Sequence, residues 1–103
     1  MKPKIGRKIY TVDCSLYDKD DWWAYIFSFT VGYLGKESFV VENYEDVSEP
    51  PEWYFRNYGE TWFTSLKAAK AYARKAVGAK RIRWQQEFFD DDGRCYQWFA
   101  EAD

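Results

Sequence analysis

The sequence predicts an α+β domain, with one antiparallel sheet of five to six strands and one α-helix packed on a face of the sheet. Three observations predict it. Most of the chain alternates with a period of two, as strands do. A single run, 66–77, has the spacing of an amphipathic helix. Short polar turns join neighbouring segments, so adjacent strands are expected to be antiparallel. The 103 residues are enough for a single domain over 1–103 with one core.

Strands precede the helix. The run 22–33 has aromatic and aliphatic side chains on both faces and is expected to be the central strand, covered on both sides. The segment 45–52 contains two prolines and four acidic residues and is expected to be a loop. The other strands before the helix are expected at 8–16, at 37–44 and, as a short fourth strand with a bend, within 53–63.

The helix is expected over 66–77, with Thr64 or Ser65 as its N-terminal cap and Gly78 just past its end. One stripe along it is small and apolar, which would let the helix lie close to the sheet. The residues of this stripe are Leu66, Ala69, Ala73, Ala76 and Val77.

A hairpin is expected after the helix, with strands at 81–89 and 94–101 around the turn 90–93. A three-residue loop would place Asp90 opposite Arg94 and gather the aromatic residues on one face, whereas a two- or four-residue loop would shift the pairing. The three-residue loop is preferred for this reason. The alternation of the strands predicts an aromatic core packed against the alanine stripe of the helix, built on Phe27, Phe29, Trp84 and Phe88.

No catalytic or cofactor site is expected. The chain has no histidine, which excludes Ser-His-Asp and Cys-His catalysis and removes the commonest metal ligand. Cys14 and Cys95 lack metal-binding spacing and are expected to be free thiols in a reducing cytosol, with one disulfide between them as the alternative. The run 90–92 is three aspartates, which a hairpin turn explains without a metal. A cytoplasmic, non-enzymatic protein without a membrane segment is expected.

Aromatic residues make up 22% of the chain, more than one small core is expected to absorb, so some rings are expected at the surface as anchors for a partner. A segment around two prolines combines rings with carboxylates, which would match a basic protein surface. The partner-binding residues expected there are Glu42, Tyr44, Glu45, Asp46, Glu49, Glu52, Trp53, Tyr54 and Tyr58. The alternative is that the acids are a solvated loop and the rings belong to the core.

Charge is unevenly placed along the chain. Residues 67–86 hold seven basic and no acidic side chains, whereas residues 9–66 hold eleven acidic and three basic ones. Local neutralisation is one interpretation, and two oppositely charged patches, one of them a docking surface, are the other. The basic run, with Lys80 included and Trp84 nearby for stacking, could also track a phosphate backbone. The residues expected on such a nucleic-acid-binding surface are Lys67, Lys70, Arg74, Lys75, Arg81 and Arg83, in the helix 66–77 and the strand 80–84.

The segment Ser65-Leu-Lys67-Ala-Ala-Lys70-Ala-Tyr-Ala73 resembles the start of the second helix in double-stranded-RNA-binding domains, which often reads Ser-Lys-Lys-x-Ala-Lys-x-x-Ala. The resemblance covers nine residues and implies phosphate contacts for Lys67 and Lys70. The rest of the chain departs from that family, since no N-terminal helix is expected and a hairpin follows the helix.

The function expected from the sequence is protein binding by a small non-enzymatic domain that covers a basic functional surface of its target. The composition is similar in kind to that of small phage-encoded inhibitors of bacterial defence proteins, including anti-CRISPR proteins. The alternative is an accessory domain that binds nucleic acid through the basic helix. The net charge of −2 by itself favours neither class.

Overall fold

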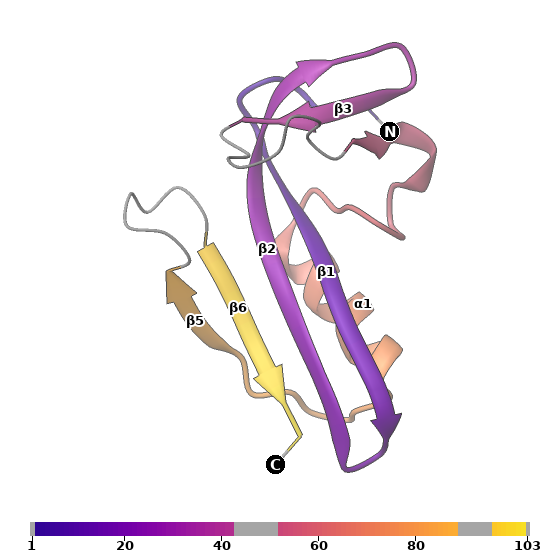
Figure 1. The fold of residues 1–103 in the computed structure, drawn as a ribbon, viewed down its shortest axis with the longest axis vertical. Coiled ribbons are helices and arrows are strands. Elements are labelled where there is room, and N and C mark those ends of the chain that lie inside the picture. The colour runs from indigo at the N-terminus through magenta and orange to yellow at the C-terminus, as the bar shows by residue number, and fades with distance from the viewer. Residues whose placement is uncertain (1, 43–51, 89–95, 103) are drawn as a thin grey trace.

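The computed structural model describes residues 2–42, 52–88 and 96–102. Within these residues the chain forms one antiparallel sheet of six strands and one α-helix (Figure 1), which confirms the predicted α+β class. The helix α1 spans Leu66–Val77, and a 3₁₀ turn spans Phe55–Asn57. The strands are β1 Lys8–Asp18, β2 Asp21–Leu34, β3 Ser38–Val41, β4 Trp53–Tyr54, β5 Gln85–Phe88 and β6 Tyr96–Glu101.

The long strand β2 organises the sheet, as its two-sided apolar pattern predicts. It pairs with β1 along one edge, and its other edge is shared between β6 near its start and β3 near its end. The pairing with β3 shifts between Val31 and Tyr33. Gly32 stands at this shift, where an added Cβ would meet the Glu42 backbone nitrogen at 3.0 Å. The close approach of the Glu42 backbone therefore favours glycine at this position.

The helix begins and ends where the sequence predicts. The Ser65 hydroxyl oxygen accepts a hydrogen bond from the Ala68 amide at 3.1 Å, so Ser65 rather than Thr64 is the cap. Gly78 ends the helix with a positive φ of 71°, a conformation that glycine adopts without strain. The buried side chains of α1 are Ala69, Ala73 and Val77. The prediction that Ala76 belongs to this stripe is wrong, since Ala76 is exposed on the flank of a narrower i, i+4, i+8 stripe.

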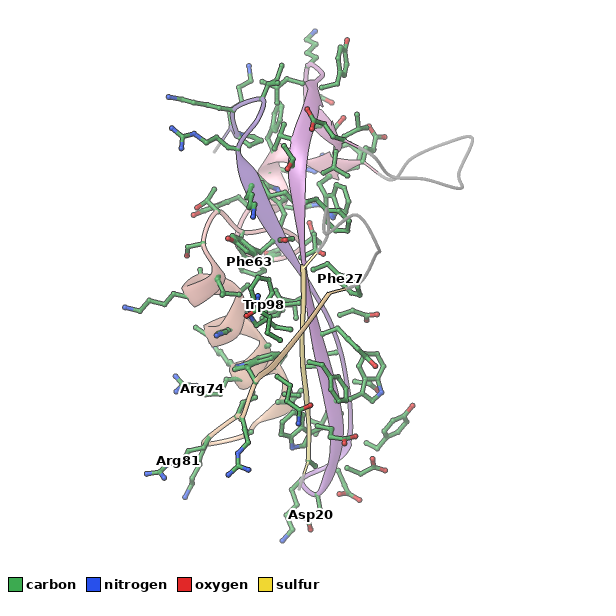
Figure 2. The ribbon with its side chains drawn as sticks, turned by 90° about the vertical axis from the view of Figure 1, so that its left-hand side faces the viewer. Asp20, Phe27, Phe63, Arg74, Arg81 and Trp98 are labelled. Atoms are coloured by element: carbon green, nitrogen blue, oxygen red, sulfur yellow. The ribbon has the colours of Figure 1, made fainter. Side chains whose placement is uncertain are left out.

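The prediction that Phe27 and Phe29 pack against the alanine stripe of the helix is wrong. The helix packs on the other face of β2, where Ala24 and Ile26 lie against the alanines of α1. Successive side chains of a strand point to opposite faces, so Phe27 lies on the side of the sheet away from α1 (Figure 2). An alanine-rich helix approaches small and aliphatic side chains more closely than a row of rings. Trp84 does pack on the helix side as predicted, and the Phe88 side chain lies outside the described atoms.

A second cluster lies where β2 pairs with β3. It contains Ile9, Val31, Phe39, Val41 and Trp62, with Trp53 and Phe55 packed against it. The bent fourth strand predicted within 53–63 is confirmed as β4, a 3₁₀ turn and a short return to the edge of β1.

The register of the C-terminal hairpin is the one that a three-residue loop predicts, because Phe88 pairs with Tyr96 and Gln86 with Trp98. The turn 90–93, the loop 45–51 and the end of the predicted third strand lie outside the described residues. The first strand of the hairpin begins at Gln85 rather than at Arg81. The preceding residues instead cross from the end of α1 toward β5, with Ile82 and Trp84 packed on the helix-side core.

Candidate functional site

The helix and the segment that follows it form a groove lined by positive charge, which we name the basic groove. Its volume is about 490 Å³. One wall comes from α1 and the other from residues 80–84. In Figure 2 the labelled side chains of Arg74 and Arg81 both lie on the helix side of the molecule. The residues that line the groove are Lys67, Lys70, Ala71, Arg74, Lys80, Arg81, Ile82 and Trp84.

Local structure explains why these two segments meet. Positions 67, 70, 71 and 74 recur at the helical period, so they share one side of α1 beside its buried stripe. Gly78 reverses the chain after the last turn, where its amide donates to the Arg74 and Lys75 carbonyls. Ile82 and Trp84 then pack on the cluster that contains Ala73 and Val77. This packing fixes the segment, and with it Lys80 and Arg81, beside the helix.

The basic groove is lined by cationic and apolar side chains together. Five of its eight lining residues are cationic and none is acidic. Like charges at this spacing repel one another, so an anion between the two walls would relieve the repulsion. The three uncharged lining residues, Ala71, Ile82 and Trp84, add an apolar surface inside the groove.

The structure brings together four of the six residues predicted for nucleic-acid binding: Lys67, Lys70, Arg74 and Arg81 line the basic groove. Lys75 is exposed but does not line it. Arg83 lines an adjacent pocket, which shares Lys80 and Arg81 with the groove and adds Lys19, Asp20 and Glu101. The Asp20 carboxylate makes that adjacent pocket less attractive to an anion, while the Glu101 side chain shares the opposite face of the sheet with its register partner Trp23.

A second basic pocket, of about 530 Å³, lies near the start of α1 and includes Thr64. Its cations come from the N-terminal segment, at Lys2, Lys4, Arg7 and Lys8. The sequence shows these four basic residues within the first eight, but their position beside Thr64 depends on contacts that are distant along the chain. Gly6 and Arg7 are bonded to β2 through the Val31 backbone, at 2.9 Å in both hydrogen bonds.

The opposite face of the sheet carries a row of rings. Trp23, Tyr25, Phe27 and Phe29 follow one another along β2, with ring centroids 5.4, 6.1 and 6.3 Å apart. Phe29 continues the row to Trp53 at 5.7 Å. On the neighbouring strands, exposed Asp13 pairs with Tyr25 and exposed Glu101 pairs with Trp23. This face therefore combines aromatic and acidic side chains, whereas the helix side carries the basic groove.

Part of the predicted acidic and aromatic docking segment is described. Tyr54 is 37% exposed, and its hydroxyl lies 3.4 Å from a Glu52 carboxylate oxygen, while the Arg56 guanidinium lies 4.9 Å from its ring. Tyr58 is equally exposed and contacts Trp62 edge-on at 4.9 Å. Trp53 is half-buried against Phe29 and Phe39. Glu42 is exposed, and the predicted residues Tyr44, Glu45, Asp46 and Glu49 lie outside the described part of the chain.

Other chemistry is sparse in the described residues. No group of three or more Cys, Asp or Glu side chains there is arranged to hold a metal ion. Cys14 is a free thiol beside the helix-side core, and burial together with the charge of Asp13 raises its pKa. Cys95 and Asp90 to Asp92 lie outside the described residues. No helix of the described residues is long and apolar enough to cross a membrane.

Comparison of the chain with models of protein families, with curated proteins and with solved structures finds no match.

Proposed function

We propose that the protein is a non-enzymatic nucleic-acid-binding module that holds a phosphate backbone in the basic groove. The observation that carries this proposal is the convergence of five cations, from α1 and residues 80–84, on one groove without a lining carboxylate. Neutralising phosphates releases the counterions condensed on the nucleic acid, which is the main source of affinity for such surfaces. Although the net charge is −2, the local charge of the groove decides this binding.

The test compares two charge reversals at adjacent positions of α1. Arg74 lines the basic groove and Lys75 does not, yet both side chains are exposed and carry one positive charge. Binding of a labelled oligonucleotide of roughly ten nucleotides is measured by fluorescence anisotropy at increasing salt. Arg74→Glu is expected to weaken binding by about tenfold at low salt, and Lys75→Glu by much less.

The salt dependence gives a second measure. A single strand contributes a slope of about −0.7 in log K against log salt for each neutralised phosphate, so five contacts predict a slope of roughly −3 to −4. Arg74→Ala is expected to make this slope shallower by about 0.7. Absence of oligonucleotide binding by the wild-type protein at low salt would reject the proposal, as would equal losses for the Arg74 and Lys75 reversals.

Protein binding through an acidic and aromatic surface is the second candidate function. It is favoured by the face opposite α1, where Trp23 and Tyr25 lie half-buried between the exposed carboxylates of Asp13 and Glu101. Such a surface suits a basic partner, because the rings supply buried area and the carboxylates match its cations. This arrangement would serve a steric inhibitor that covers a basic site of its target.

Capture from a bacterial lysate distinguishes the two candidates. Under the second candidate, a protein partner stays bound after nuclease treatment, and the double variant Asp13→Lys with Glu101→Lys releases it while Arg74→Glu does not. Under the first, nuclease treatment removes the captured material, and Arg74→Glu prevents its capture.

A further inference from the structure

The basic groove contains an aromatic side chain that phosphate binding alone does not require. Trp84 lines the groove together with Ile82 and Ala71. It is only half-buried, and it also packs against two clusters of the helix-side core, one with Val77 and the other with Ala69. An indole ring held in place by the core and still reachable from the groove is a preformed stacking surface.

The shape of the basic groove bears on which nucleic acid it accepts. Its volume of about 490 Å³ is within the range of roughly 300–1,000 Å³ that small-molecule sites have, a size class suited to one nucleotide unit. In a duplex the bases are stacked on one another, and only their edges and the phosphates face a protein. A duplex would therefore leave the Trp84 ring without a partner.

Cations line both walls of the basic groove. Lys67, Lys70 and Arg74 follow one another at three- and four-residue intervals, and a helix rises about 1.5 Å per residue, so the charges advance along the axis in steps of about 4.5–6 Å. These steps suit successive phosphates of an extended strand. Lys80 and Arg81 line the other wall. Walls of positive charge around an aromatic surface are typical of sites that bind single strands.

We propose that the basic groove binds single-stranded nucleic acid in preference to duplex, with one base stacked on Trp84 and the neighbouring phosphates on the cations of both walls. The inference depends on the proposed function, and it adds the class of nucleic acid and the contact that selects it.

The first test keeps the wild-type protein and varies the ligand. Three probes of roughly ten units are compared by anisotropy at one salt concentration: oligo(dT), a duplex that contains it, and a strand of abasic deoxyribose phosphates. Oligo(dT) is expected to bind at least about tenfold more tightly than the abasic strand, because stacking on an aromatic side chain contributes about one such factor per base. It is also expected to bind more tightly than the duplex.

The second test varies Trp84. Trp84→Leu is expected to weaken oligo(dT) binding by about tenfold and to leave binding of the abasic strand unchanged, while Trp84→Phe retains most of the affinity. The slope of affinity against salt stays the same in both variants, because stacking releases no counterions. Trp23→Leu, on the opposite face of the sheet, is the matched control and should bind like the wild type. Circular dichroism shows whether each variant is folded.

The outcomes separate the inference from the proposed function. If none of the three probes binds at low salt, both fail. If oligo(dT), the duplex and the abasic strand bind equally, the groove recognises charge alone, so the proposed function stands and the single-strand inference is rejected. Equal binding of poly-glutamate and oligo(dT) rejects both the inference and the proposed function, since it points to an acidic protein as the partner.

Discussion

Trp62 and Phe63 are adjacent in the chain, yet their rings lie in two different hydrophobic clusters. Trp62 is fully buried with Ile9 and Phe39, whereas Phe63 packs with Ile26 and Ala69 on the helix side. Two backbone hydrogen bonds between Phe63 and Tyr10, at 2.8 and 2.9 Å, hold this segment at the edge of β1. The extended backbone then points consecutive side chains to opposite faces, so one dipeptide ties the two clusters together.

Trp62→Phe should lower the free energy of unfolding by at least about 1 kcal/mol, because it removes the indole N–H that donates to the Tyr54 carbonyl at 2.8 Å. Trp62→Ala should cost about 3–5 kcal/mol through the cavity it leaves. Urea denaturation followed by circular dichroism measures both values. Wild-type stability of Trp62→Ala would show that this cluster does not hold the fold together.

Ile26→Ala should destabilise the protein more than Phe27→Ala, although phenylalanine is the larger residue. Ile26 is fully buried against Phe63 and α1, and its truncation is expected to cost about 2–5 kcal/mol. Phe27 is half-buried on the opposite face, where part of its ring is already in contact with water. Thermal melting of the two variants checks the order, and the reverse order would mean that the helix covers the other face.

Ser65→Ala should lower stability by about 1 kcal/mol, because the Ala68 amide loses the hydroxyl oxygen that caps the helix. Thr64→Ala is the matched control. Among the described residues, the Thr64 hydroxyl bonds to the exposed hydroxyl of Tyr58, at 3.1 Å, and does not cap α1. Equal losses for the two variants in denaturant titrations would contradict the assignment of Ser65 as the cap.

The Cys14 thiol should react slowly with iodoacetamide at neutral pH, because burial first and the charge of Asp13 second raise its pKa and the thiolate is the reactive form. The reaction rate, measured in a Cys95→Ser background, is expected to rise with pH as the thiolate forms. Because the pKa is raised, this rise should occur at a higher pH than for an ordinary cysteine. Asp13→Asn should lower the pKa and speed the reaction at a given pH. An unchanged rate in Asp13→Asn would show that the carboxylate does not act on the thiol.

The same shift determines how Cys14 affects stability. Its pKa is higher in the folded protein than in the unfolded chain, so folding favours the protonated thiol. The stability that results is fully present at pH values below the pKa of Cys14 in the unfolded chain. It is lost as the pH rises through the pKa of Cys14 in the folded protein. Cys14→Ser should therefore make the stability of the protein less dependent on pH in the alkaline range, as measured by denaturant midpoints.

Local patterns in the sequence were sufficient for most of the elements. The cap at Ser65, the end at Gly78 and the pairing of Phe88 with Tyr96 depend on residues that are near one another in the chain. The alternation along 22–33 likewise predicts a central strand. The positive run 67–86 contains all five cations of the basic groove, because a helix face and the segment just after it are local features.

Tertiary structure decided which face of β2 the helix covers. Both faces are apolar, so hydrophobicity does not distinguish them, and the choice depends on how closely Ala69 and Ala73 approach Ile26 rather than Phe27. Tertiary structure also placed Trp84 inside the basic groove and Lys2 to Lys8 beside Thr64. The physical reason is that packing depends on how well side chains from segments distant in sequence fit together. Periodicity, capping and turn preferences depend only on residues that are near one another along the chain.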